Sequence, residues 1–218
     1  MIRQIKDVAG FALDLLYPEL CMFCDAVLGS EENEKKYLTC GKCLGEINVV
    51  HRTDSVFCLL KYVDAAEKVV RAFKYHKQKR YAYCAGLLVA SYVKKDANAL
   101  QGDVIMPIPL FAARQKQRGY NQAEVMCGAI AAETGLPVLS GLRRIKNTPA
   151  LYGLSREERE QAIAGAFDYI PEKDGLIRDK TVILVDDILT SGATFNECAK
   201  VLKENGAAEV KLVTFAYS

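Results

Sequence analysis

The segment from Val182 to Thr194 limits the possible folds of this chain more than any other part of its sequence. It begins with four apolar residues, continues through the acid pair Asp186 and Asp187, and ends in a turn of small and hydroxyl-bearing residues. An apolar run bounded in this way predicts a buried strand, and the residues after the turn predict a helix. A strand that leads directly into a helix favours an α/β domain.

The same segment contains the residue types that hold a phosphorylated sugar. Ligands of open α/β sheets bind beyond the carboxyl ends of the strands, where the acid pair is expected. Backbone N–H groups at the start of a helix, together with the helix dipole and nearby hydroxyls, can bind a phosphate. The two carboxylates can accept hydrogen bonds from vicinal sugar hydroxyls. The predicted ribose 5-phosphate site comprises Asp186, Asp187, Thr190, Ser191, Gly192, Ala193 and Thr194.

The acid pair also fits a purely structural role. Two acids at the end of a strand can simply cap the following helix, and the sequence leaves that alternative open. A Walker A phosphate loop is excluded, because no Gly-Lys-Ser/Thr follows the strand.

The rest of the chain from Phe57 onward alternates between strand and helix patterns. Strands are expected over 57–62, 104–106, 181–185 and 209–217, and helices over 65–75, 81–94, 121–134 and from the turn to 205. Ser155 and Glu158 have the spacing of a capping box that opens a further short helix. This alternation predicts a mostly parallel sheet flanked by helices.

Two basic segments are candidates for contact with the ligand. The first follows a predicted strand and leads through a basic turn to a helix; it contains Pro107, Arg114 and Arg118. The second is the connection from Arg143 to Arg159, whose length without regular structure is typical of active-site lids. A solvated basic turn and a plain surface loop are the respective alternatives.

The N-terminal part contains two cysteine pairs with the spacing of a zinc ribbon. Cys21 and Cys24 form one C-x2-C pair, and Cys40 and Cys43 form the other, with fifteen residues between the two pairs. Four thiolates close the tetrahedral coordination shell of Zn²⁺ and leave no position for chemistry, so the predicted zinc site is structural. A redox role for one C-x-x-C pair is the alternative. The other cysteines are expected to be buried packing residues: Cys58, Cys84, Cys127 and Cys198.

Charge and hydropathy restrict the setting in which this chain works. The formal net charge of +2 is too small for nucleic-acid binding through overall charge, so such binding requires a local cluster. One cluster is basic and interleaved with aromatics, and its candidate nucleic-acid contacts are Lys74, Tyr75, Lys77, Lys79 and Arg80. A solvated helix end is the alternative. No secretory signal or membrane span is evident, and we expect a cytoplasmic protein with reduced thiols.

The order of these motifs resembles the ComF/GntX family over nearly the whole chain. The motifs are an N-terminal helix, the four-cysteine ribbon, Phe-Lys-Tyr at 73–75, Pro-Ile-Pro-Leu at 107–110 and Arg-Gly-Tyr-Asn-Gln at 118–122. The segment 182–194 is similar to the 5-phosphoribosyl 1-pyrophosphate (PRPP) motif of type I phosphoribosyltransferases, with both acids, the glycine and the last threonine in register. The resemblance implies a helix over 1–18, a zinc ribbon over 19–52 and a type I phosphoribosyltransferase fold over 53–218.

The resemblance also implies a ligand and a biological setting. Members of the family have a PRPP site, used with Mg²⁺, and are thought to assist the handling of incoming single-stranded DNA beside a competence ATPase. Lys74 and Arg143 belong to segments that face or cover the PRPP pocket in such proteins. This chain departs from the family pattern at Leu151 and Ala162, where relatives have Gln and Asn.

Three functions follow as alternatives. In a non-catalytic module, the pocket holds PRPP or a nucleic-acid phosphate while the zinc ribbon and the basic cluster contact DNA or a protein. In an active phosphoribosyltransferase, Asp186 and Asp187 stabilise the cationic ribosyl transition state while Arg114, Arg118 and Arg143 bind the leaving pyrophosphate. A sensor of PRPP in purine metabolism is the third. The first is favoured.

Overall fold

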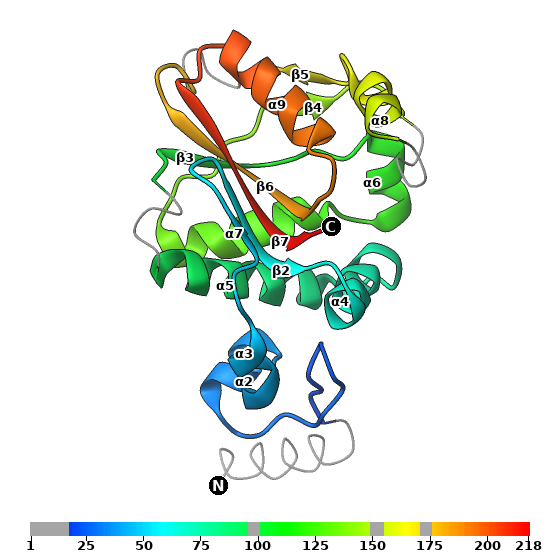
Figure 1. Ribbon diagram of the computed structural model, residues 1–218, viewed down its shortest axis with the longest axis vertical. Coiled ribbons are helices and arrows are strands. Elements are labelled where there is room, and N and C mark those ends of the chain that lie inside the picture. The colour runs from blue at the N-terminus through cyan, green and yellow to red at the C-terminus, as the bar shows by residue number, and fades with distance from the viewer. Residues whose placement is uncertain (1–17, 96–100, 149–154, 171–175) are drawn as a thin grey trace, which may run out of the picture. The chain divides into compact units, whose positions relative to one another are not determined.

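The computed structural model describes residues 18–95, 101–148, 155–170 and 176–218 (Figure 1). The contacts within the chain divide it after Ile47 into two units. The helix predicted for 1–18 lies outside the described residues except at its last position.

The first unit contains two short helices around the cysteine pairs, α2 (Glu32–Tyr37) and α3 (Gly41–Glu46). The carboxylate of Glu34 joins them to the preceding loop, because it accepts hydrogen bonds from the backbone N–H of Gly29 at 2.7 Å and of Gly41 at 2.6 Å. The sequence predicted a loop-rich segment here. The helices are short and contain no buried residue, which is why no apolar stripe marked them.

A five-stranded sheet forms the centre of the second unit. Its strand order is β1 (His51–Arg52), β2 (Val56–Lys61), β7 (Glu209–Tyr217), β6 (Thr181–Leu189) and β3 (Val104–Pro107). β1 pairs with β2 in the antiparallel sense, and all other pairs are parallel. The predicted mostly parallel sheet is confirmed.

Helices cover both faces of this sheet (Figure 1). Side chains alternate along β6, so Val182 and Leu184 join the core beneath α9 (Ala193–Glu204), whereas Ile183 and Val185 point to the opposite face. On that opposite face, α7 (Gln122–Thr134) packs against β6 and β3, and α5 (Lys79–Lys95) packs against α7. β2 is followed by α4 (Asp64–Tyr75), which contacts α5.

A small second sheet lies beside α9 and corrects one expectation. β4 (Leu142–Arg144) pairs with β5 (Phe167–Tyr169), and α8 (Arg156–Ile163) precedes β5. The connection from Arg143 was expected to lack regular structure up to the helix that Ser155 opens, but it begins in a strand. The capping box that opens α8 is confirmed, since Ser155 and Glu158 exchange both hydrogen bonds. Residues 149–154, including Leu151, lie outside the described residues.

Two further differences concern the predicted site. The basic turn after Pro107 is a helix, α6 (Ala112–Arg118), so Arg114 and Arg118 extend from a helical scaffold. The acid pair was expected beyond the end of its strand, but β6 continues to Leu189 because its pairing with β7 continues to Tyr217.

Candidate functional site

The acid pair and the turn after it lie where β6 leads into α9. Asp186 is partly exposed whereas Asp187 is 3% exposed, because successive side chains of a strand point to opposite faces. Gly192 caps α9 with φ of 80°, a left-handed conformation that favours glycine. The turn encloses a cavity of about 30 Å³, lined among others by Asp186, Thr190, Gly192 and Thr194.

This arrangement has the properties of an anion site next to a pair of hydrogen-bond acceptors. The backbone N–H groups at the start of α9 have no partners inside the helix and point towards the turn. The side chains of Thr190 and Thr194 add hydroxyls on either side of Gly192. A phosphate on the turn would place the rest of its ligand within reach of Asp186.

Asp187 is held from two other elements. Lys74, in the last turn of α4, forms an ion pair with its Oδ2. Gln122, at the start of α7, donates from Nε2 to its Oδ1 at 3.4 Å. Gln122 in turn accepts a hydrogen bond from Arg118. Residues from two helices therefore contact one buried carboxylate, and Arg118 of a third helix supports it through Gln122.

The two acids differ in their protonation behaviour. Burial, reinforced by the neighbouring negative charge of Asp187, raises the pKa of Asp186 well above its usual value. Burial is also the largest single effect on Asp187 and acts to raise its pKa, but the charge and hydrogen bond of Lys74, the hydrogen bond with Asp186 and the charge of Arg118 together lower that pKa. Asp187 is therefore the acid that stays ionised, and Asp186 is the one that takes up a proton more readily.

The segment after β3 lies against β6, as the ligand site requires. Pro107 ends β3 in register with Val185, and the N–H of Ile108 donates to the carbonyl of Val185 at 2.9 Å. The side chain of Asn121 donates to the carbonyl of Ile108 at 3.0 Å and also accepts from the N–H of Ala123, which caps α7.

The arginines of the predicted site do not all face it. Arg143 is exposed on β4, whereas its neighbour Arg144 lies on the same face as buried Leu142. Arg144 donates to the hydroxyl of Thr148, and its guanidinium lies 5.4 Å from the centre of the Phe167 ring. Its pKa is lowered, first by burial and then by the positive charge of Arg114, while Asp186 acts in the opposite direction.

Sequence reasoning therefore missed Arg144 and Gln122 as site residues. The alternation of a three-residue strand separates Arg144 from Arg143, but the sequence did not show that a strand forms there. Gln122 was visible in the Arg-Gly-Tyr-Asn-Gln motif, yet nothing in the motif indicates that its amide reaches Asp187.

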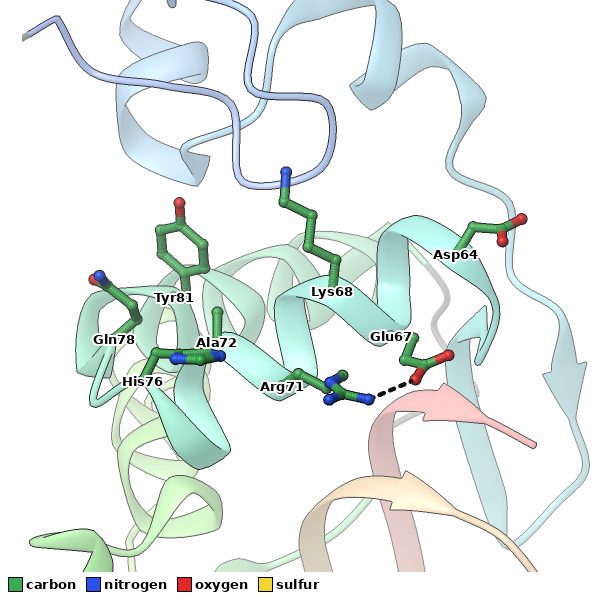
Figure 2. A pocket seen from close by; sticks show the side chains of 8 residues that line it. All are labelled: Asp64, Glu67, Lys68, Arg71, Ala72, His76, Gln78 and Tyr81. Atoms are coloured by element: carbon green, nitrogen blue, oxygen red, sulfur yellow. Dashed lines mark hydrogen bonds and ion pairs between the residues drawn. The ribbon is translucent and has the colours of Figure 1, made fainter.

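A second surface lies along the outer side of α4 and the start of α5. Figure 2 shows a hollow there, lined by Asp64, Glu67, Lys68, Arg71, Ala72, His76, Gln78 and Tyr81. Arg71 forms an ion pair with Glu67 at 3.4 Å. The predicted nucleic-acid contacts Tyr75, Lys77, Lys79 and Arg80 are exposed, and they neighbour lining residues of this hollow in the sequence. Lys74 instead points to Asp187, with 21% of its side chain exposed.

The four N-terminal cysteines gather into one cluster, and their thiols fit a metal ion. Their Sγ atoms all lie within 4.8 Å of one another, and those of Cys24 and Cys40 are 3.7 Å apart. Four thiolates at the usual Zn–S distance of about 2.3 Å are about 3.8 Å from one another. A hydrogen bond from the backbone of Ala26, assisted by the other thiols, lowers the pKa of Cys24 to about 7, although burial opposes it. The cluster can therefore hold a metal such as zinc.

The remaining four cysteines, Cys58, Cys84, Cys127 and Cys198, are buried as predicted. Burial raises the pKa of Cys127 to about 12 and that of Cys58 to about 11, so both thiols stay protonated. In the described parts of the chain, no helix has the length and apolar character needed to cross a membrane.

Comparison with known proteins shows what this chain is similar to. Residues 97–218 match the family model of the phosphoribosyl transferase domain. The chain is 27% identical to Competence protein F of Haemophilus influenzae, with 84% of this chain and 86% of that protein covered. It is 28% identical to DNA utilization protein YhgH of Salmonella typhimurium, with 80% of this chain and 76% of that protein covered. It is 30% identical to competence protein ComFC of Streptococcus pneumoniae, with 56% of this chain and 51% of that protein covered.

Proposed function

This chain belongs to the phosphoribosyl transferase domain family as a ComF-type member, and we therefore propose that it binds PRPP or a related phosphorylated ribose. In this proposal the 5-phosphate lies on the turn 190–194, and the ribose hydroxyls donate to the acid pair. The observation that supports it most is the placement of an acceptor pair directly before a small-residue turn at the start of a helix. A phosphate and two vicinal hydroxyls of one ribose are the groups that such a turn and acceptor pair would bind.

The diphosphate of the ligand requires positive charge on the other side of the acid pair. We propose Arg114, Arg118 and Arg144 for this role, with Mg²⁺ bound to the diphosphate itself. Arg143 is exposed, whereas Arg144 interacts electrostatically with Arg114 and Asp186, so we assign this role to Arg144 in preference to Arg143. Pro107 contributes by fixing the loop that follows β3.

The biological role that we propose is the handling of single-stranded DNA in natural competence. The names of the relatives, competence proteins and DNA utilization proteins, support this role. The exposed side chains of Tyr75, Lys77, Lys79 and Arg80 offer cations for phosphates and a ring for base stacking. We propose that the cysteine cluster holds a structural Zn²⁺ and that a competence ATPase is a partner. The zinc ribbon expected over 19–52 ends with the first unit at Ile47, because His51 and Arg52 pair with β2 in the sheet of the ligand-binding domain.

The proposal is tested by calorimetric titration of PRPP with Mg²⁺ into the wild-type protein and into Asp186→Asn/Asp187→Asn. We expect a micromolar dissociation constant for the wild type and no measurable binding by the double variant, because both acceptors of the ribose hydroxyls lose their charge. Asp54→Asn is the matched control, since Asp54 is exposed in the turn between β1 and β2. It should bind like the wild type.

Two results would change the proposal. A folded, zinc-loaded wild-type protein that does not bind PRPP would overturn the ligand assignment. Release of pyrophosphate on addition of a nitrogen base would show an active phosphoribosyltransferase, which is the alternative function. In that case Asp186 and Asp187 would be catalytic residues that stabilise the ribosyl cation.

A further inference from the structure

The side chain of Lys74 points to the acid pair and is largely shielded from solvent. It lies one residue before the end of α4, and its Nζ is paired with Oδ2 of Asp187, whose side chain is only 5% exposed. An ion pair buried to this extent is costly to form unless both partners are well held. The structure supplies that support on both sides.

On the lysine side, the end of α4 is fixed by a contact from the motif Arg-Gly-Tyr-Asn-Gln. The hydroxyl of Tyr120 donates to the backbone carbonyl of Phe73, the residue directly before Lys74. On the carboxylate side, Gln122 donates to Oδ1 of Asp187, and Arg118 orients the amide of Gln122. One short motif therefore holds both partners of the ion pair.

We propose that Lys74 is a positioning residue: it fixes the carboxylate of Asp187 in its ionised form, so that Asp187 meets a ribose hydroxyl as a rigid acceptor while Asp186 adapts to the ligand. This inference rests on the proposed function for its ligand, but the ion pair itself does not. It also removes Lys74 from the set of residues that contact nucleic acid.

The other charged groups near Asp187 do not substitute for Lys74. Asp186 adds a negative charge, which makes ionisation of the pair harder. The charge of Arg118 also lowers the pKa of Asp187, but by less than that of Lys74, and the guanidinium of Arg118 donates to Gln122. Tyr62, whose pKa is raised by burial, carries no charge at physiological pH. Lys74 is thus the cation in direct contact with Asp187 among the described residues.

A double-mutant cycle separates positioning from direct ligand contact. Lys74→Met, Asp187→Asn and Lys74→Met/Asp187→Asn are titrated with PRPP and Mg²⁺. If Lys74 acts through Asp187, the double variant binds about as weakly as Asp187→Asn alone. If Lys74 contacts the ligand, the losses of the two single variants multiply, and the proposal is overturned. Lys95→Met, which removes an exposed lysine from the last turn of α5, is the control and should bind like the wild type.

The pH profile of binding provides a readout that a purely structural lysine would not move. Removing Lys74 raises the pKa of Asp187. As the pH falls, Asp187 should therefore take up a proton, and PRPP affinity should be lost, about one to three pH units higher in Lys74→Met than in the wild type. Lys74→Arg keeps the charge and should restore the profile. An unchanged profile in Lys74→Met would contradict the proposal.

A ligand-free measurement keeps the inference testable if PRPP fails to bind. Carbon-13 NMR titration of the Asp187 carboxyl should show a lowered pKa in the wild type and in Lys74→Arg, and a raised one in Lys74→Met. If PRPP does not bind but this titration pattern is observed, the assignment of the ligand is overturned and the role of Lys74 in ionising Asp187 is retained. Equal carboxyl titrations in the wild type and Lys74→Met would overturn the inference about Lys74.

Discussion

At the scale of single residues, the site depends on differences between neighbours. Asp186 and Asp187 are adjacent, yet one is partly exposed with a raised pKa and the other is buried with a lowered pKa. Arg143 and Arg144 are adjacent, yet only Arg144 faces inward. In both pairs the alternation of a strand separates residues that look equivalent in the sequence.

Gly192 gives a prediction at this scale. An added Cβ would meet Asn196 and Leu189 only at 3.8 and 3.9 Å, so Gly192→Ala costs backbone strain at φ of 80° without a clash. That strain is about 1–2 kcal/mol of unfolding free energy. We expect a folded variant in urea denaturation with PRPP affinity reduced at least tenfold, because the turn relaxes towards negative φ and its N–H groups leave the phosphate.

The matched control is Gly135→Ala at the end of α7, where φ is 76° and an added Cβ meets nothing within 4 Å. It should lose similar stability and keep the wild-type affinity for PRPP. Equal affinities in the two variants would mean that the conformation of Gly192 does not matter for the phosphate.

At the scale of elements, the sequence predicted what local patterns determine. The final strand matches β7 at both ends, and the apolar periods of α4, α5 and α7 predicted those helices to within two residues. The predictions that failed depend on distant partners. β4 is three residues long and exists because it pairs with β5, and β6 passes through the acid pair because β7 extends beside it. α6 has no buried residue, so its basic composition indicated a turn.

The same reasoning explains what could be predicted of the site. The strand, acid, turn and helix segment is contiguous, so its chemistry was readable from one stretch of sequence. The ion pair of Lys74 with Asp187 joins α4 to β6, and no local pattern indicates it. Lys74 was accordingly predicted both as a ligand contact and as a nucleic-acid contact, and its ion pair with Asp187 was not predicted.

The start of α5 gives a prediction at the scale of elements. If Lys77 and Lys79 contact DNA phosphates, the variant Lys77→Ala/Lys79→Ala should reduce the slope of log K against log salt for single-stranded DNA by about 1.4, since each phosphate contact contributes about 0.7. Fluorescence anisotropy with an oligonucleotide over a range of salt concentrations measures this slope.

The opposite end of the same helix supplies the control for this test. Lys94→Ala/Lys95→Ala removes the same charge from the last turn of α5 and should leave the slope unchanged. Equal slope changes in both variants would indicate attraction by overall charge, and no change in either would place the DNA elsewhere.

At the scale of the whole molecule, the functional site is larger than the family domain that the chain matches. The matched residues 97–218 contain β3, α6, α7, β6 and α9, whereas Lys74 belongs to α4 before them. The matched domain therefore contains the turn 190–194 and the acid pair, and Lys74, from an element outside the match, forms an ion pair with one of the acids. The cysteine cluster belongs to a separate unit that ends at Ile47.

The proposed function requires above all that a phosphorylated ribose occupies the end of β6. A crystal structure of the protein grown with PRPP and Mg²⁺ tests this requirement most directly. We predict density for the 5-phosphate on the turn 190–194, with the ribose hydroxyls at Asp186 and Asp187 and the ion pair from Lys74 still in place. Ligand density in the hollow beside α4, with the turn empty, would contradict the proposed function.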